Sequence, residues 1–183
     1  MAGLLPIDVE LRLSGGATNR ESNAALGGIM SSFEVMPHSM QGLFHDLDSV
    51  VLGAGAGSHY RCIYVYNRHN TDVLTNCTVF INTVCTYIHR TTGVPTAANL
   101  AINIGADLAG VGGVAAVTAN ELTAPAGPVV FTAPVTYGTG VNLGNIPAGS
   151  EAALWLKLDW PILANRNASP DHYFGLSIES TVP

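Results

Sequence analysis

Paired carboxylates are the first chemistry to seek in this sequence, because two acids flanking a glycosidic bond can hydrolyse it. The candidate pairs are Asp46 with Asp48, and Asp159 with either Glu121 or Glu151. All of these acids stand at positions typical of an ordinary protein surface. The phosphate-binding motif GxxxxGK[ST] and the nucleophile motif GxSxG are both absent. The sequence therefore predicts no catalytic residue, and we expect the protein not to be an enzyme.

Histidines and neighbouring acids could instead hold a metal ion. His45, Asp46 and Asp48 lie close together in the chain, and His59 and His69 bracket one strand-like run. We interpret the first group as part of a solvated loop and assign no ligand role to the two histidines. No metal site and no cofactor are predicted.

Aromatic side chains could form a platform for stacking on a sugar. A stripe of aromatics at strand spacing is more typical of a core or a subunit interface. If the protein binds glycans, Trp155 is the expected stacking residue, since Trp160 shares the face of Leu154 to Leu158. The aromatic residues in question are Tyr60, Tyr64, Tyr66, Tyr87, Trp155 and Trp160.

Three cysteines, Cys62, Cys77 and Cys85, form no CxxC pair. Buried free thiols in a reducing compartment are the favoured interpretation, and a Cys62–Cys77 bridge remains an alternative. Two Asn-x-Ser/Thr matches, at Asn76 and Asn167, are interpreted as chance because no secretory signal precedes them.

The strand pattern that would position these residues centres on Tyr60–Asn67 and Val73–Asn82, with the polar RHNTD segment between them as a hairpin-type turn. Alternation also predicts strands at Ile7–Leu13, Glu151–Trp160 and Tyr173–Ser180. Shorter strands are expected at Leu100–Ile104, ended by Gly105, and at Val114–Thr118, Val129–Thr132 and Val141–Ile146. The predicted core is Ile63, Val65, Val79, Ile81, Leu154, Leu156, Phe174 and Leu176.

Short strands separated by Gly, Pro and Asn turns predict an all-β fold, a two-layer antiparallel β-sandwich with an extended N-terminal arm. We divide the chain into residues 1–58, an N-terminal strand plus arm, and residues 59–183, the sandwich domain. The stretch 14–58 is too long and too apolar for an ordinary loop, yet it has no sustained period. We expect it to bind a neighbouring subunit through four anchors, which are Phe33, Met36, Leu43 and Phe44.

The amino-acid composition restricts the classes of partner that this protein is expected to bind. Charged residues make up 11% of the chain, against about 25% in an average protein. The formal net charge is −6, and the seven Lys and Arg residues are scattered. This balance disfavours nucleic acid and anionic membrane surfaces. No apolar run reaches the length of a membrane span. Sparse charge is compatible with extensive contact between subunits.

Several segments carry a family resemblance: IDVELRLSGG at 7–16 with Asn19 and the ALGG at 25–28, YRCIYVYN at 60–67, and LTNCTVFI at 74–81. Others are ELTAPAGPVVFTAP at 121–134, the LGNIPAG turn at 143–149 and YFGLSIES at 173–180. In these segments the chain resembles small virion structural proteins of tailed bacteriophages.

The resemblance implies an immunoglobulin-like or jelly-roll sandwich in an assembled particle. We expect a capsid cement or decoration protein, bound to the major capsid protein and to copies of itself in a homo-oligomer. It would be part of a virion assembled in the host bacterial cytoplasm. A tail or baseplate component is one alternative, and a carbohydrate-binding module for attachment to the host surface is another.

Overall fold

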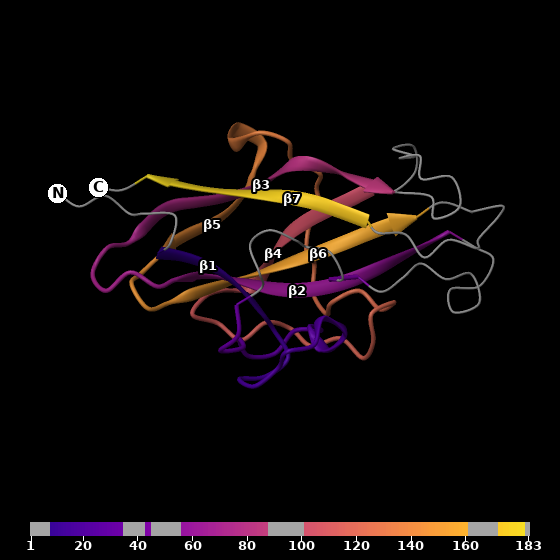
Figure 1. Ribbon diagram of the computed structural model, residues 1–183, viewed down its shortest axis with the longest axis horizontal. Helices are drawn as coiled ribbons and strands as arrows, with labels where there is room; N and C mark the ends of the chain where they lie inside the picture. Colours follow the sequence, from indigo (N-terminus) through magenta and orange to yellow (C-terminus); the bar gives the residue numbers. More distant parts are fainter. Residues whose placement is uncertain (1–7, 35–42, 45–55, 88–100, 161–171, 182–183) are drawn as a thin grey trace.

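The computed structural model describes residues 8–34, 43–44, 56–87, 101–160 and 172–181. In these residues the chain forms two antiparallel sheets, one of four strands in the order β1-β2-β6-β4 and one of three in the order β5-β3-β7 (Figure 1). The predicted all-β sandwich is confirmed. The strands are β1 (Val9–Leu13), β2 (Gly57–Asn67), β3 (Leu74–Tyr87), β4 (Ala101–Val111), β5 (Val141–Ile146), β6 (Glu151–Trp160) and β7 (His172–Thr181).

The strand order differs from that of immunoglobulin constant domains, in which the first, second, fifth and fourth strands share a sheet. Here the sixth strand, β6, lies between β2 and β4. The two-layer sandwich predicted from the sequence therefore holds, with a strand order that differs from that of an immunoglobulin constant domain.

The main core lies between the two sheets. Alternation along β6 directs Leu154, Leu156, Leu158 and Trp160 inward, as predicted, and all four are buried. Seven of the eight predicted core residues are at most 5% exposed. The eighth, Leu176, is partly buried against the same core.

The predicted hairpin between the two central strands is wrong. β2 pairs with β1 on one side and with β6 on the other, so neither edge is left for β3. β3 lies in the opposite sheet, between β5 and β7. The segment 68–73 is consequently a crossing between layers, and the Asn67 amide donates to the carbonyls of Asp72 (2.8 Å) and Ile146 (2.9 Å).

The sequence predicted that this strand ends at Gly105, but β4 continues to Val111. Gly105 serves instead as a point of close approach, because a Cβ there would lie 2.6 Å from the carbonyl oxygen of Val130. The two weak strands predicted around Ala115 and Thr132 are reduced to single bridges, Gly28–Ala115 and Ile104–Thr132.

The predicted division of the chain at residue 58 falls inside β2. β1 is an edge strand of the four-stranded sheet, paired from Val9–Asn67 to Leu13–Ile63. Residues 9–13 are thus part of the sandwich.

Candidate interaction surface

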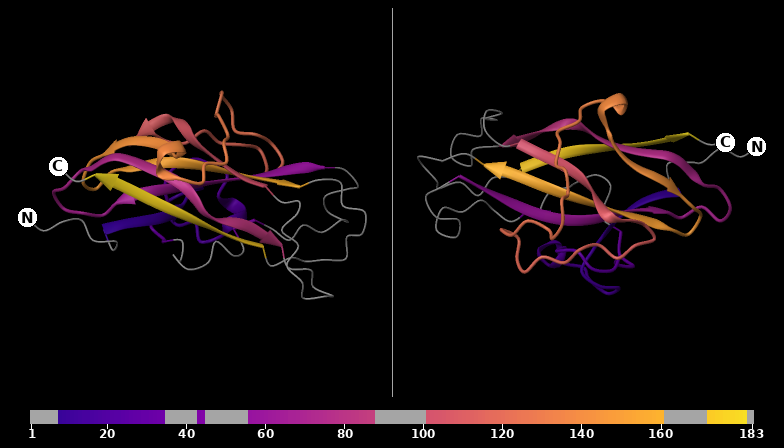
Figure 2. Two further views of the ribbon diagram at one scale, coloured as in Figure 1. Left: turned by 90° about the horizontal axis from the view of Figure 1, so that it is seen from above. Right: turned by 180° about the vertical axis from the view of Figure 1, so that it is seen from behind.

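The outward face of the four-stranded sheet is covered by two loops, residues 14–31 and 112–131, which we call the outer layer. They lie together beneath β2 in Figure 1 and again in the reverse view of Figure 2. Beyond the end of β1, the backbones of the two loops form hydrogen bonds with the edge of β2 that β1 leaves unpaired. Ala25 O accepts from Cys62 N (2.8 Å), and Glu121 O accepts from Tyr60 N (2.7 Å).

The two loops also bond to each other. Gly28 N donates to Ala115 O and Thr118 N donates to Leu26 O, both at 3.0 Å. Gly27 has a positive φ of 94°, and a Cβ there would lie 1.7 Å from the oxygen of Ala116. Only glycine permits this approach, so the GG of the ALGG segment fixes how the loops meet.

Tyr64 of β2 joins both loops to the sheet. Its hydroxyl donates to the carbonyl of Gly28 and accepts from the amide of Ala115 (2.9 Å). The side chain is 1% exposed. Burial raises the pKa of Tyr64 to about 12, so the neutral donor form persists well above neutral pH.

Asp107 of β4 makes a second attachment. Its carboxylate accepts from Trp155 Nε1 (2.8 Å), from Ala109 N (2.8 Å) and from Ala116 N (3.1 Å). Trp155 is fully buried, at 0% exposure. The prediction that Trp155 offers an open face for sugar stacking is therefore wrong, because the outer layer covers the side of β6 on which it lies.

A second, smaller apolar cluster results under the outer layer. It contains Cys62, Tyr64, Ala115, Ala153 and Trp155, with Met30, Tyr60, Val129 and Phe131 packed against it. The four-stranded sheet is consequently buried on both faces along much of β2 and β6. This explains why the outward positions of these strands beneath the outer layer hold Cys62, Tyr64, Ala153 and Trp155.

Two acids of the candidate carboxylate pairs are paired with other groups in the structure. Glu121 is ion-paired with the fully buried guanidinium of Arg61. Asp159 pairs with Lys157 at 2.9 Å and accepts from Asn103 Nδ2 at 2.9 Å. Glu151 and Asp159 stand at opposite ends of β6, about 26 Å apart at ~3.3 Å per residue. That separation is far beyond the reach of a glycosidase pair. His45, Asp46 and Asp48 lie outside the described residues.

The four residues predicted to anchor the arm on a neighbouring subunit differ in where the structure places them. Leu43 and Phe44 are 3% and 1% exposed and belong to the main core of this chain. Phe44 packs on Phe174 with ring centroids 6.1 Å apart, and Leu43 O accepts from Arg61 Nε at 2.9 Å. In this structure the two residues face their own sandwich rather than a neighbour. Phe33 is half-buried beneath the guanidinium of Arg20 (3.9 Å), and Met36 lies outside the described residues.

Cys62 and Cys77 are free thiols, buried in different clusters. The alternative of a bridge between them fails, because Cys62 lies under the outer layer while Cys77 lies between the sheets. Burial raises the pKa of both thiols, that of Cys77 to about 12.

Exposed aliphatic side chains gather where the two loops of the outer layer meet. The Gly28–Ala115 bridge sets Ile29 beside Val114, and a Cβ on Gly28 would lie 3.7 Å from Val117 Cγ2. We call Ile29, Val114 and Val117 the aliphatic patch; they are exposed by 50%, 60% and 67%, respectively.

Charge is nearly absent from the second loop and its surroundings. Between Leu108 and Ser150 the only charged residue is Glu121, and its carboxylate is turned to Arg61. A chain segment of this length without a free charge is unusual for a surface that meets only water. The small residues of this segment have no periodicity from which the sequence could place them on the surface.

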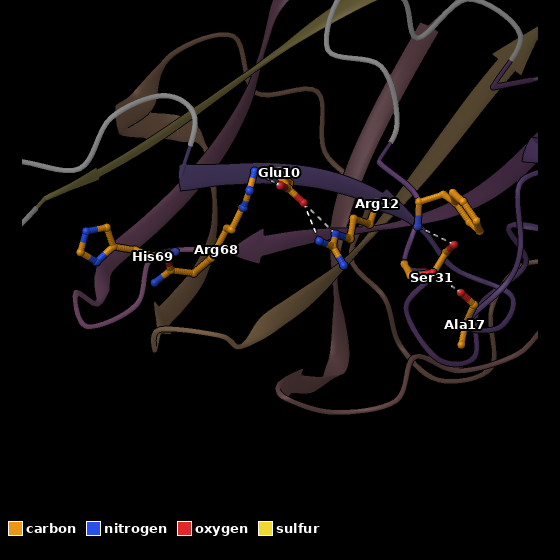
Figure 3. A network of polar contacts seen from close by, with 9 residues as sticks. Glu10, Arg12, Ala17, Ser31, Arg68 and His69 are labelled. Carbon is orange, nitrogen blue, oxygen red and sulfur yellow. Dashed lines mark hydrogen bonds and ion pairs between the residues drawn. The ribbon is translucent and has the colours of Figure 1, made fainter.

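Charged groups occur instead at the β1 edge, next to the first loop. Glu10 pairs with Arg12 at 2.6 Å and with Arg68 at 3.1 Å (Figure 3). Arg12 also lies 4.2 Å from the centroid of the Tyr66 ring. The carboxylate of Glu10 is buried at the centre of this network, so the charges are paired within the chain rather than offered to a partner.

Comparisons with protein-family models, with curated protein sequences and with solved structures found no match. Within the described ranges, no helix has the length and apolar character needed to cross a membrane. In the same residues no group of three or more His, Cys, Asp or Glu side chains is arranged to hold a metal ion.

Proposed function

We propose that this protein is a structural subunit of a bacteriophage particle, a capsid cement or decoration protein. It binds the major capsid protein and copies of itself and needs no cofactor. The observation that carries the proposal is the aliphatic patch, where Ile29 of the first loop meets Val114 and Val117 of the second, a loop whose one charged residue, Glu121, is ion-paired. Exposed apolar side chains grouped in this way mark protein–protein contact sites. The resemblance to small virion proteins is the reason for assigning this contact to a phage particle.

The sandwich suits such a role. Its two sheets are joined by a large core and its outer layer is held by buried side-chain anchors, so the contact surface is rigid before a partner arrives. A preorganised surface loses little entropy on binding. Many copies on one shell add weak contacts into a strong total.

The carbohydrate-binding alternative loses its best residue through the burial of Trp155. Among the described aromatic residues, Tyr137 is exposed by 41%, and a lone tyrosine is a poor platform. We do not favour this alternative.

Electron cryomicroscopy of the intact particle that contains this protein tests the proposal. The expected result is density for the sandwich on the outside of the capsid, in a fixed ratio to the major capsid protein. Density in the tail or baseplate would replace the decoration role by the tail alternative. Absence from the purified particle would refute the proposal as a whole.

A further inference from the structure

We propose that the aliphatic patch is the surface through which two copies of this chain bind each other. The proposal deepens the proposed function by assigning one of its contacts, but the contact itself requires no particle. Three features of the outer layer carry it: the grouping of the side chains, their rigid mounting and the distribution of charge.

The grouping places three branched side chains from two loops within one small area. Ile29 comes from the first loop, and Val114 and Val117 come from the second. Each is at least half exposed, although branched aliphatics are among the residue types most often buried. Burying such side chains against a partner removes apolar area from water, which is the main driving force of association.

The mounting keeps these side chains from turning inward. Ala115, between Val114 and Val117, is 2% exposed and its amide donates to the Tyr64 hydroxyl. The amide of the next residue, Ala116, donates to the buried carboxylate of Asp107. With the inner side of this segment fixed, the outward side is fixed as well.

The charge distribution selects a second copy as the occupant. The chain carries a formal net charge of −6, so two copies repel each other over most orientations. The second loop contributes no unpaired charge, and the exposed charges of the first loop, Arg20 and Glu21, are opposite in sign, so the patch is a face on which that repulsion is least. A strongly charged partner would instead leave its own groups desolvated and unpaired against these aliphatics.

Symmetry fits the same conclusion. A twofold axis places the same patch on both partners, so an uncharged aliphatic surface is complementary to itself. A stable interface needs about 800 Å² from each partner, which is less than a tenth of the 9198 Å² accessible surface of this chain. The contact therefore requires only a small part of the surface, centred on the patch.

The test is the molar mass of the full-length protein in solution, measured by sedimentation equilibrium over a range of concentrations. The wild-type chain is expected to associate. Val114→Asp and Val117→Asp each place a carboxylate in the contact on both copies, and each is expected to raise the dissociation constant by roughly 100-fold or more.

Val135→Asp is the matched control. Val135 is exposed by 60%, as Val114 is, but it follows Pro134, whose carbonyl bonds to Ile81 of β3 in the other sheet. This variant is expected to associate as the wild type does. Circular dichroism and thermal unfolding of all variants check that they fold, which is expected because each altered side chain is solvent-exposed.

Two results would overturn the inference. One is a wild-type chain that stays monomeric up to about 1 mM, the weakest affinity worth assigning to a site. The other is an equal response of Val135→Asp and Val114→Asp, which would show that added charge rather than its place matters. Neither result bears on whether the protein occurs in a phage capsid, so the two proposals fail separately.

Discussion

At the scale of single residues, a few buried polar groups hold the outer layer in place. Tyr64 and Asp107 stand on different strands of the four-stranded sheet, and each bonds to backbone amides of residues 112–131. A buried donor that loses its acceptor costs about 1–3 kcal/mol. Loss of either side chain is therefore expected to lower the free energy of unfolding substantially.

Replacing Asp107 by alanine is expected to lower the free energy of unfolding by about 2–4 kcal/mol, because three donors lose their acceptor at once. Urea titration followed by tryptophan fluorescence measures the loss. Asp107→Asn, which keeps one acceptor oxygen, should cost less, and exposed Glu179→Ala should cost almost nothing. A neutral Asp107→Ala would contradict the role given to this carboxylate.

Alkaline pH is expected to destabilise the fold. Burial raises the pKa of Cys77 from 9.0 to about 12 and that of Tyr64 from 10.0 to about 12. Each group ionises first in the unfolded chain, so its stabilising effect is complete below the unfolded value and disappears as the pH rises to about 12.

Unfolding titrations from pH 8 upward measure this effect. Between pH 9 and 12 the free energy of unfolding should fall by about 1.4 kcal/mol per pH unit for each buried thiol. Cys77→Ala should be less steep by one such contribution, whatever its stability at pH 8. An unchanged slope in this variant would show that the thiol titrates normally in the folded protein.

Residue-level prediction from the sequence succeeded for the main core and failed at Trp155. Alternation along β6 correctly placed Trp155 on the opposite face of the strand from Leu154 and Leu156. What alternation cannot show is whether the opposite face meets water. At Trp155 that face is covered by the outer layer, while Lys157, two residues further on, remains partly exposed. The free state of Cys62 and Cys77 follows from the same layering.

At the scale of elements, close backbone approaches decide how the loops lie against the strands. Gly105 lets residues 129–132 run along β4, where Ile104 and Thr132 exchange both backbone hydrogen bonds. Pro134 O then accepts from Ile81 N of β3. One segment thus connects the edge strand β4 of one sheet with the central strand β3 of the other.

Gly105→Ala is expected to destabilise the protein by about 1–3 kcal/mol, since the new methyl group would meet the backbone of Val130. Gly138→Ala is the control, because a Cβ there has no atom within 4 Å. Thermal unfolding should separate the two variants clearly. Equal melting temperatures would show that the segment moves away at little cost.

Phe44→Ala is expected to cost about 3–5 kcal/mol in the isolated chain, because Phe44 is part of the main core. Phe33→Ala, at a half-buried position, should cost distinctly less. Chemical unfolding of both variants without any partner decides the matter. If Phe44→Ala were neutral in isolation and weakened only an assembly, the original expectation of a docking anchor would be restored.

The strands predicted from the sequence were β1, β2, β3, β5, β6 and β7, together with the first part of β4. The pairing of β2 with β3 was mispredicted because neighbouring strands often form hairpins, whereas here β6 already takes that edge. The outer layer was missed because Gly, Ala and Pro segments have no alternation. Its only sequence signal was the ALGG motif, whose glycines permit the contact with Ala116.

At the scale of the whole molecule, repulsion between like-charged copies opposes association through a neutral patch. The Debye length falls from about 30 Å at 0.01 M salt to about 8 Å at 0.15 M. Self-association of this acidic chain is therefore expected to strengthen several-fold over that range. Sedimentation at the two salt concentrations measures it, and weakening by salt would point to a contact made by opposite charges instead.

The aliphatic patch also bears on how the protein behaves outside any assembly. A protein with a net charge and an uncharged apolar patch on its surface is amphiphilic. At an air–water boundary it should settle with Val114 and Val117 toward the air. Thin films prepared for imaging would then show one dominant view, and Val117→Asp would restore a random spread of orientations.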